Sequence, residues 1–164
     1  MKHFFLILLI SMLPFSSFAE EKGRETGLAT PRFVSLKANE ANLRKGPGTR
    51  YPIEWVFKRK ALPVEVLEEF GHWRRIRTSD GTNGWLHKQM LSGSRHALIT
   101  DQQHVTLRAN PEDNAPPALK LESGVVASIE ECEQAWCLIQ IGEHEGWLEK
   151  SKFYGAYAKE LYNR

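Results

Sequence analysis

Residues 42–52 read NLRKGPGTRYP, and two further landmarks follow this stretch, Trp73 and a Gly-Trp-Leu triplet at 84–86. The same three landmarks recur 62 to 64 residues later in the chain: Thr-Leu-Arg at 106–108, Trp136 and Gly-Trp-Leu at 146–148. Recurrence at a nearly fixed spacing indicates an internal duplication. Each repeated unit has about 60 residues, which is small but sufficient for a domain that folds alone.

The hydrophobic pattern around these landmarks is that of β-strands. Residues 62–68, LPVEVLE, place apolar side chains at every second position, and residues 73–77 follow as a second short strand. Ser-Asp-Gly at 79–81 then predicts a hairpin turn before the Gly-Trp-Leu triplet. The second unit repeats this order, with strands expected at 125–131 and 136–141 and a turn at Gly142. Short strands joined by turns, without a long amphipathic helix, predict a small all-β barrel or sandwich for each unit.

The stretch at 42–52 closely resembles the N-L-R-x-G-P-G-T-x-Y-P signature of bacterial SH3-like domains, and YPIEWV at 51–56 is typical of their exported, two-copy members. The second copy departs from the signature, because Asn-Pro-Glu at 110–112 replaces Gly-Pro-Gly. The resemblance implies an all-β protein of two tandem SH3-like β-barrels after a cleaved signal peptide. It also implies a binding role toward the cell wall or peptides.

The first residues have the features of a secretory signal peptide. Lys2 precedes an apolar run at 4–15, and small residues suit cleavage after Ala19. The residue directly after the cut is Glu20 and not a cysteine, and no later segment could span a bilayer, so we expect a periplasmic or secreted protein without a lipid anchor. The expected division of the chain is a signal peptide, an N-terminal segment, two SH3-like domains and a tail, at 1–19, 20–32, 33–93, 94–155 and 156–164.

Export makes the two cysteines informative, because exported compartments are oxidising. Cys132 and Cys137 are separated by four residues, so a tight turn would join them in a disulfide. The loop that this bond closes is short, which corresponds to a stabilisation of about 2 kcal/mol. A metal site made by both cysteines and His144 is the alternative, but it lacks the fourth ligand of structural zinc.

Composition narrows the possible partners. The 164 residues carry a formal charge of +2 and 41% are hydrophobic, which excludes a multi-span membrane protein. The first copy is net basic and the second net acidic. One interpretation is that the opposite charges help the two copies pack together. The other is that the basic runs at 58–60 and 74–77 bind an anionic envelope polymer. Nucleic acid is disfavoured as a partner because the protein is exported.

Four residues of the first copy are the candidate binding site. Tyr51 and Trp55 flank its long loop and offer stacking surfaces for a sugar or a proline-rich peptide. Arg44 and Arg50 could contact anionic groups. We expect Trp85 and Trp147 to plug or cap the two cores, Gly46 and Gly48 to supply the permissive dihedral angles of a tight turn, and the second copy to be mainly structural.

Catalysis finds no support in the residue pattern. The five histidines that follow the signal peptide belong to no zinc-protease or nucleophile motif, and Gly-Pro-Gly lacks the lysine and the following helix of a phosphate-binding loop. We therefore expect no enzyme, cofactor or metal. The predicted function is non-catalytic recognition of peptidoglycan or another envelope component. The alternative is an envelope scaffold that binds a protein partner and has no glycan affinity.

Overall fold

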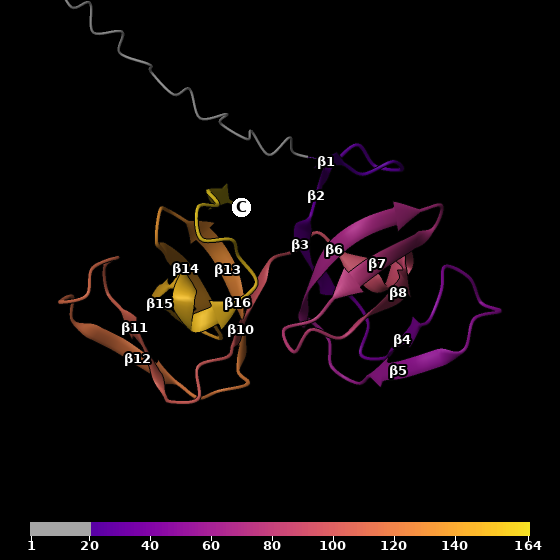
Figure 1. Ribbon diagram of the computed structural model, residues 1–164. Coiled ribbons are helices and arrows are strands. Elements are labelled where there is room, and N and C mark those ends of the chain that lie inside the picture. The colour runs from indigo at the N-terminus through magenta and orange to yellow at the C-terminus, as the bar shows by residue number, and fades with distance from the viewer. Residues whose placement is uncertain (1–20) are drawn as a thin grey trace, which may run out of the picture.

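The computed structural model describes residues 21–164, which form two lobes side by side (Figure 1). Regular structure in these residues consists of strands and two three-residue 3-10 helices, so the all-β prediction is confirmed. No helix within the described range is long and apolar enough to cross a membrane. The predicted signal peptide, residues 1–19, lies outside the described residues.

The first copy is one antiparallel sheet, ordered β5-β4-β8-β7-β6-β3-β9. A small hairpin of β1 (Glu21–Lys22) and β2 (Ala29–Thr30) precedes it. Its elements are β3 (Arg32–Leu36), β4 (Ala41–Arg44), β5 (Ile53–Phe57), β6 (Pro63–Phe70), β7 (Trp73–Arg77), β8 (Asn83–His87), η1 (Lys88–Met90) and β9 (Leu91–Ser92).

The second copy repeats this arrangement in the order β12-β11-β15-β14-β13-β10-β16, with β17 added beside β13. Its elements are β10 (His96–Ile99), β11 (Val105–Arg108), β12 (Pro117–Leu121), β13 (Val126–Cys132), β14 (Trp136–Ile141), β15 (His144–Glu149), η2 (Lys150–Lys152), β16 (Phe153–Tyr154) and β17 (Tyr162–Asn163). The ladders within residues 21–164 do not pair the outermost strands of either sheet. Closure of each sheet into a barrel therefore stays a prediction.

Each copy has its own hydrophobic core of mainly aliphatic side chains, and within residues 21–164 neither core includes a tryptophan. Leu86 and Leu148 are buried, whereas the preceding Trp85 and Trp147 are only half-buried and belong to neither core, so they do not plug the cores as one form of the prediction had it. The glycine of each triplet explains the difference. A Cβ at Gly84 would lie 2.6 Å from Leu43 Cγ, so this position accepts no side chain and the tryptophan faces the other side of the strand.

The turn at residues 45–52 uses its glycines in a different way from the one predicted. Neither Gly46 nor Gly48 has a positive φ angle. A Cβ at Gly46 would instead lie 2.5 Å from the Tyr51 ring, so the glycine provides room for that ring. Ala115 takes the place of Tyr51 in the second copy, which removes the need for a glycine and explains how Asn110 is accommodated.

The same backbone hydrogen bonds form this turn in both copies. Lys45 N donates to Pro52 O at 3.1 Å, and Ala109 N donates to Pro116 O at 2.9 Å. Arg44 Nη1 donates to the Tyr51 carbonyl at 2.7 Å, and Arg108 Nη1 donates to the equivalent Ala115 carbonyl at 3.1 Å. The second copy thus keeps the fold of the loop although its sequence departs from the signature.

The disulfide prediction is confirmed: Cys132 and Cys137 are joined between β13 and β14. Their pairing leaves no free thiol in the chain, which overturns the alternative of a metal site with His144. The two cysteines are buried in the second core.

We expect a Cys132→Ala/Cys137→Ala variant to lose about 2 kcal/mol in free energy of unfolding, because the unfolded chain is no longer cross-linked. Urea unfolding with and without a reductant measures the effect. The reductant should destabilise the wild type by a similar amount and leave the variant unchanged. A variant as stable as the oxidised wild type would contradict the prediction.

The C-terminal segment packs against the second copy. Tyr162 and Asn163 form β17 beside β13, and Arg164 makes an ion pair with Glu130 at 2.9 Å. The Lys150 ammonium group donates to the carbonyl oxygens of Gln134 and Glu160, both at 2.6 Å. These contacts hold the last residues of the chain in place.

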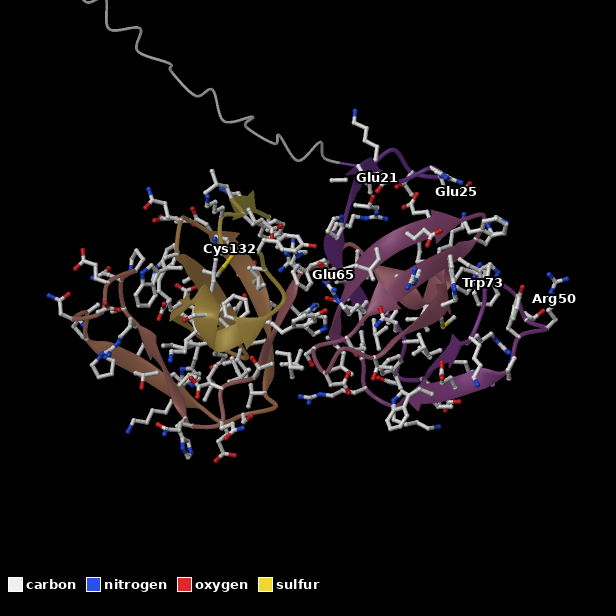
Figure 2. All side chains as sticks on the ribbon, in the orientation of Figure 1. Glu21, Glu25, Arg50, Glu65, Trp73 and Cys132 are labelled. Carbon is white, nitrogen blue, oxygen red and sulfur yellow. A yellow bond between two sulfur atoms is a disulfide. The ribbon has the colours of Figure 1, made fainter. Side chains whose placement is uncertain are left out.

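Aromatic residues join the two copies. The Phe33 ring contacts Tyr154 and Tyr157, with ring centroids 4.9 and 4.7 Å apart. The Tyr157 hydroxyl donates to Glu65 Oε1 at 2.8 Å, and Glu65 lies where the lobes meet (Figure 2). Burial and the nearby Glu65 raise the pKa of Tyr157 well above its usual value, so its hydroxyl remains a donor at physiological pH.

A buried carboxylate ties the N-terminal hairpin to the first copy. Glu69 on β6 accepts hydrogen bonds from the backbone N–H groups of Glu25 and Thr26, both at 2.9 Å, and from the Thr26 hydroxyl at 2.8 Å. It also pairs with Arg32 at 2.7 Å and with Arg74 at 3.4 Å. One side chain therefore holds a segment more than forty residues away in the sequence.

Candidate functional site

Three of the four predicted binding residues lie together at the turn after β4. Arg44 Nη1 donates to the carbonyl oxygens of Thr49 and Tyr51, so its guanidinium group holds the turn. The Arg50 guanidinium carbon lies 5.3 Å from the centre of the Tyr51 ring. Figure 2 places Arg50 at the outer end of the first lobe, away from Glu65 at the junction. A ligand-binding role for these three residues stays a prediction.

Trp55 lies apart from this group, on β5. Its register partner is the buried Leu43, and Leu43 and Arg44 point to opposite faces of β4. Trp55 therefore shares the inner face of the sheet with Leu43. Because β5 is the outermost strand, the indole is not covered, and Trp55 is 59% exposed.

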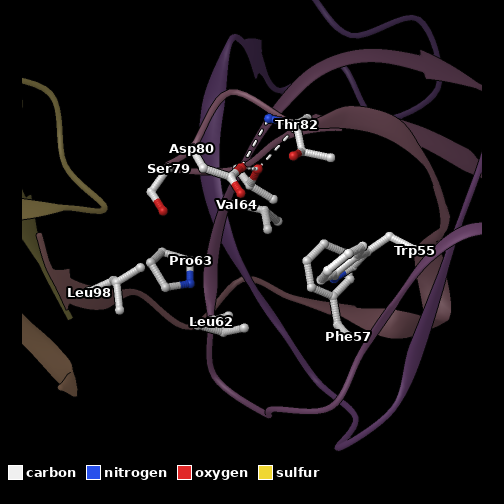
Figure 3. A pocket seen from close by; sticks show the side chains of 10 residues that line it. Trp55, Phe57, Leu62, Pro63, Val64, Ser79, Asp80, Thr82 and Leu98 are labelled. Carbon is white, nitrogen blue, oxygen red and sulfur yellow. Dashed lines mark hydrogen bonds between the residues drawn. The ribbon is translucent and has the colours of Figure 1, made fainter. Parts of the chain in front are cut away.

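A hollow of about 260 Å³ opens beside the Trp55 ring. Trp55 and Phe57 face it from one side, and Pro63 and Leu98 lie across from them (Figure 3). Leu98 belongs to β10 and is the contribution of the second copy to this wall. The remaining lining residues are Leu62, Val64, Thr78, Ser79, Asp80 and Thr82.

Among residues 21–164, Asp80 is the only charged residue that lines this hollow. Its Oδ1 atom accepts hydrogen bonds from the Thr78 hydroxyl and from the Thr82 backbone N–H, which is 3.0 Å away. These bonds hold the pKa of Asp80 below its usual value, so the carboxylate is ionised at neutral pH. Its second oxygen, Oδ2, makes no hydrogen bond within the described residues and is available as an acceptor.

The second copy also fixes the turn that carries Asp80. The Tyr154 hydroxyl donates to the Arg77 carbonyl at 2.9 Å, directly before Thr78. Arg59, which lies shortly before Leu62 in the chain, donates from Nη1 to the Gly124 carbonyl at 2.7 Å. The Thr78–Thr82 turn and the segment before Leu62 are thus both bonded to the second copy.

The two copies also share an equivalent outer groove. In the first copy it is lined by Asn42, Arg44, Thr49, Trp73 and His87, and by Glu40 and Met90. In the second copy the corresponding residues are Thr106, Arg108, Asp113, Trp136 and Glu149. The duplicated landmarks of the sequence account for this equivalence, but the second groove is the more charged of the two.

Within residues 21–164, four of the six basic residues in the runs at 58–60 and 74–77 have a carboxylate partner. Lys58 pairs with Glu40, Arg75 with Glu68 at 3.6 Å and Arg77 with Glu65. Arg74 is buried beside Glu69 and donates to the carbonyls of Gly71 and Trp73. The geometry therefore gives the anionic-polymer hypothesis little support. The Tyr154 and Tyr157 contacts with residues near Glu65 instead favour packing between the copies.

The sequence identified Trp55 but missed the residues around it. Asp80 was recognised only as part of a hairpin turn, and Phe57 and Leu98 carried no signal of a site. They meet at Trp55 only because the strand order of the first sheet and the contact between the copies bring them together. The duplication could have indicated the outer grooves, since their residues recur at the same spacing.

Comparison with known proteins agrees with the duplicated fold. The model of the bacterial SH3 domain matches residues 37–93 and 101–155. A protein of Bacillus subtilis (strain 168), named "Putative N-acetylmuramoyl-L-alanine amidase YrvJ", is 27% identical over 162 residues. The match covers 90% of this chain but only 29% of that relative.

Three solved structures also align with most of the chain. NlpC1 and NlpC2 of Trichomonas vaginalis are both 11% identical, with TM-scores of 0.36 and 0.35. An NlpC/P60 family protein of Bacillus cereus ATCC 10987 is 13% identical, with a TM-score of 0.34. The alignments cover 88, 77 and 76% of this chain, and 51, 49 and 57% of those chains. The two matched segments, which span most of residues 21–164, make this chain a member of the bacterial SH3 domain family with two copies of the domain.

Proposed function

We propose that this protein binds peptidoglycan through its first SH3 domain, with the Trp55 hollow as the site. Bacterial SH3 domains typically bind cell-wall components, and the family match supplies this general expectation. The observation that carries the proposal is the placement of Trp55. A large aromatic ring that is 59% exposed beside a hollow offers a contact surface that the fold itself leaves unused.

We further propose that binding occurs without catalysis. The two matched domains account for most of the described residues, and of these residues the Trp55 hollow is lined by one carboxylate and by no histidine or cysteine. The amidase activity in the name of the Bacillus subtilis relative belongs to a protein of which this chain matches 29%. That activity is not carried over to this chain.

The proposed location is the periplasm or the cell exterior. The disulfide between Cys132 and Cys137 supports it, because such bonds persist in oxidising compartments. The apolar segment at 4–15 and the small residues before Glu20 fit export as well.

Co-sedimentation with purified sacculi tests the proposal. We expect the protein without residues 1–19 to pellet with sacculi, and Trp55→Ala to weaken this binding at least about tenfold, as truncation of a central aromatic contact does. Phe70→Ala is the matched control, since Phe70 is also 59% exposed but does not line the hollow. Circular dichroism should show that all three proteins are folded.

The possible outcomes separate the two predicted functions. Loss of binding by Trp55→Ala alone supports recognition of the wall at the hollow. If the wild type stays in the supernatant, the peptidoglycan proposal is wrong. Cross-linking in the periplasm would then identify the protein partner of an envelope scaffold.

A further inference from the structure

We propose that the Trp55 hollow receives one sugar ring of a glycan strand and that the second copy forms part of this sugar site. This inference rests on the proposed function and specifies it in two respects. It assigns the site to the carbohydrate of the wall and not to the peptide. It also makes the pair of domains, rather than the first domain alone, the binding unit.

The shape and the apolar side of the hollow suit a flat ring. Trp55 and Phe57 lie together on one side of it (Figure 3), and a volume of about 260 Å³ is sufficient for a single sugar unit. The faces of a sugar ring carry C–H groups, which pack against an exposed indole and remove apolar surface from water.

The polar side of the hollow is arranged to accept hydrogen bonds. Within residues 21–164 no hydrogen bond reaches Asp80 Oδ2, since the bonds from the Thr78 hydroxyl and the Thr82 N–H both end on Oδ1. Ser79 and Thr82 add hydroxyl groups to the lining, and no lysine or arginine side chain is among the lining residues. A carboxylate accepts only, so the ligand must bring donors. Sugar hydroxyls supply several on one ring, whereas proline residues have no N–H at all.

Charge also favours a neutral ligand. The Asp80 carboxylate disfavours an anion in the hollow. A neutral, hydroxyl-rich ring avoids this cost and uses the aromatic and acceptor groups together.

The second copy contributes to the proposed sugar site through two residues, Leu98 and Tyr154. Leu98 projects from β10 into the lining of the hollow, since its neighbours Ala97 and Ile99 point into the second core. Tyr154 acts through the turn and is a positioning residue: its hydroxyl holds the Arg77 carbonyl and so sets where the Thr78–Thr82 turn places Asp80.

The first experiment tests the ligand class with Asp80→Asn. Asparagine keeps an oxygen for the Thr78 and Thr82 bonds but replaces the free acceptor by an NH₂ donor. Two probes are used, chitotetraose with peptide-free glycan strands on one side and the stem peptides released from sacculi on the other. We expect the wild type to bind the glycans, and Asp80→Asn to weaken this binding about tenfold or more. Asp113→Asn, on the second copy outside this hollow, should have no effect.

The second experiment tests the part played by the second copy with Leu98→Thr. Threonine is β-branched and therefore compatible with the β10 strand, but its side chain is shorter and more polar than that of leucine. We therefore expect glycan affinity to fall about fivefold at unchanged thermal stability. Tyr154→Phe removes the bond to Arg77 and should also weaken glycan binding, less than Asp80→Asn does.

These outcomes are distinguishable from failure of the proposed function. If sacculi bind the wild type and release Trp55→Ala, but only the stem peptides compete, the sugar assignment is overturned while wall binding stands. If glycans bind Leu98→Thr and Tyr154→Phe as tightly as the wild type, the role of the second copy is overturned. If the wild type does not bind sacculi at all, the proposed function fails and this inference fails with it.

Discussion

Replacing Glu69 by glutamine is expected to lower the free energy of unfolding by about 3 kcal/mol, because the substitution leaves two arginines without their carboxylate. The Glu69 side chain is fully buried, and those of Arg32 and Arg74 are 18 and 5% exposed. Glutamine has nearly the same shape, so the change removes charge without creating a cavity. Urea unfolding followed by tryptophan fluorescence measures the loss.

Glu68→Gln is the matched control on the same strand. Glu68 pairs with Arg75 at 3.6 Å, but both side chains are about half exposed. Exposed pairs contribute at most about 1 kcal/mol and often nothing measurable. Equal losses for the two variants would show that Glu69 does not have the role assigned to it.

The Glu69 carboxylate also makes the free energy of unfolding depend on pH in the acidic range. Burial raises the pKa of Glu69, but hydrogen bonds from Thr26, Arg32 and the backbone N–H groups of Glu25 and Thr26 outweigh it and lower the pKa from 4.5 to about 2. A depressed folded-state pKa stabilises the protein above the unfolded value, and this stabilisation is lost as the pH falls from about 4.5 toward 2. We expect wild type and Glu69→Gln to differ by about 3 kcal/mol at pH 7 and to converge near pH 2.

Replacing Gly155 by alanine is expected to destabilise the second copy by about 3 kcal/mol or more. A Cβ at this position would lie 2.1 Å from the His96 carbonyl oxygen, and φ is +140°, which L-residues rarely adopt. The clash is with backbone, which cannot move aside as a flexible side chain would. The Gly155 carbonyl also accepts a hydrogen bond from Arg95 at 2.7 Å, so the distortion would reach the C-terminal segment.

Gly124→Ala separates the clash from the dihedral strain. Gly124 has φ +81°, but nothing lies within 4 Å of an added Cβ. We expect a loss of about 1 kcal/mol at Gly124, from the dihedral angle alone. Thermal unfolding of the two variants provides the comparison. A Gly155 variant that is no less stable than the Gly124 variant would contradict the close approach of Gly155 to the His96 carbonyl.

The sequence was sufficient to predict strands, their order of appearance and the duplication, because these depend on local patterns. The alternation at 62–68 and the Asp-Gly turn are local, and β6 and the Thr78–Thr82 turn confirm them. The hydrophobic pattern did not predict contacts between residues that are far apart in the chain. Glu69 reads as a solvent-facing residue, but a bulge between Val66 and Glu68 shifts the alternation, and the N-terminal hairpin then covers Glu69.

The candidate site was predicted only in part for the same reason. An exposed tryptophan near a long loop was enough to select Trp55, but its grouping with Arg44 did not anticipate that the two residues face opposite sides of the sheet. Leu98 could not be found, because it contributes only after two separately folded sheets meet. Gly46 was assigned to the turn for its dihedral freedom, whereas its partner is the Tyr51 ring.

The most direct test of the account is the response of the Trp55 indole N–H resonance to soluble peptidoglycan fragments. The chain has five tryptophans, and Trp55→Phe identifies the signal of interest. We expect the Trp55 resonance to shift in a saturable manner while that of Trp147, in the second copy, stays in place. Saturable shifts of other tryptophans with an unchanged Trp55 signal would contradict the assignment of the wall-binding site to this hollow.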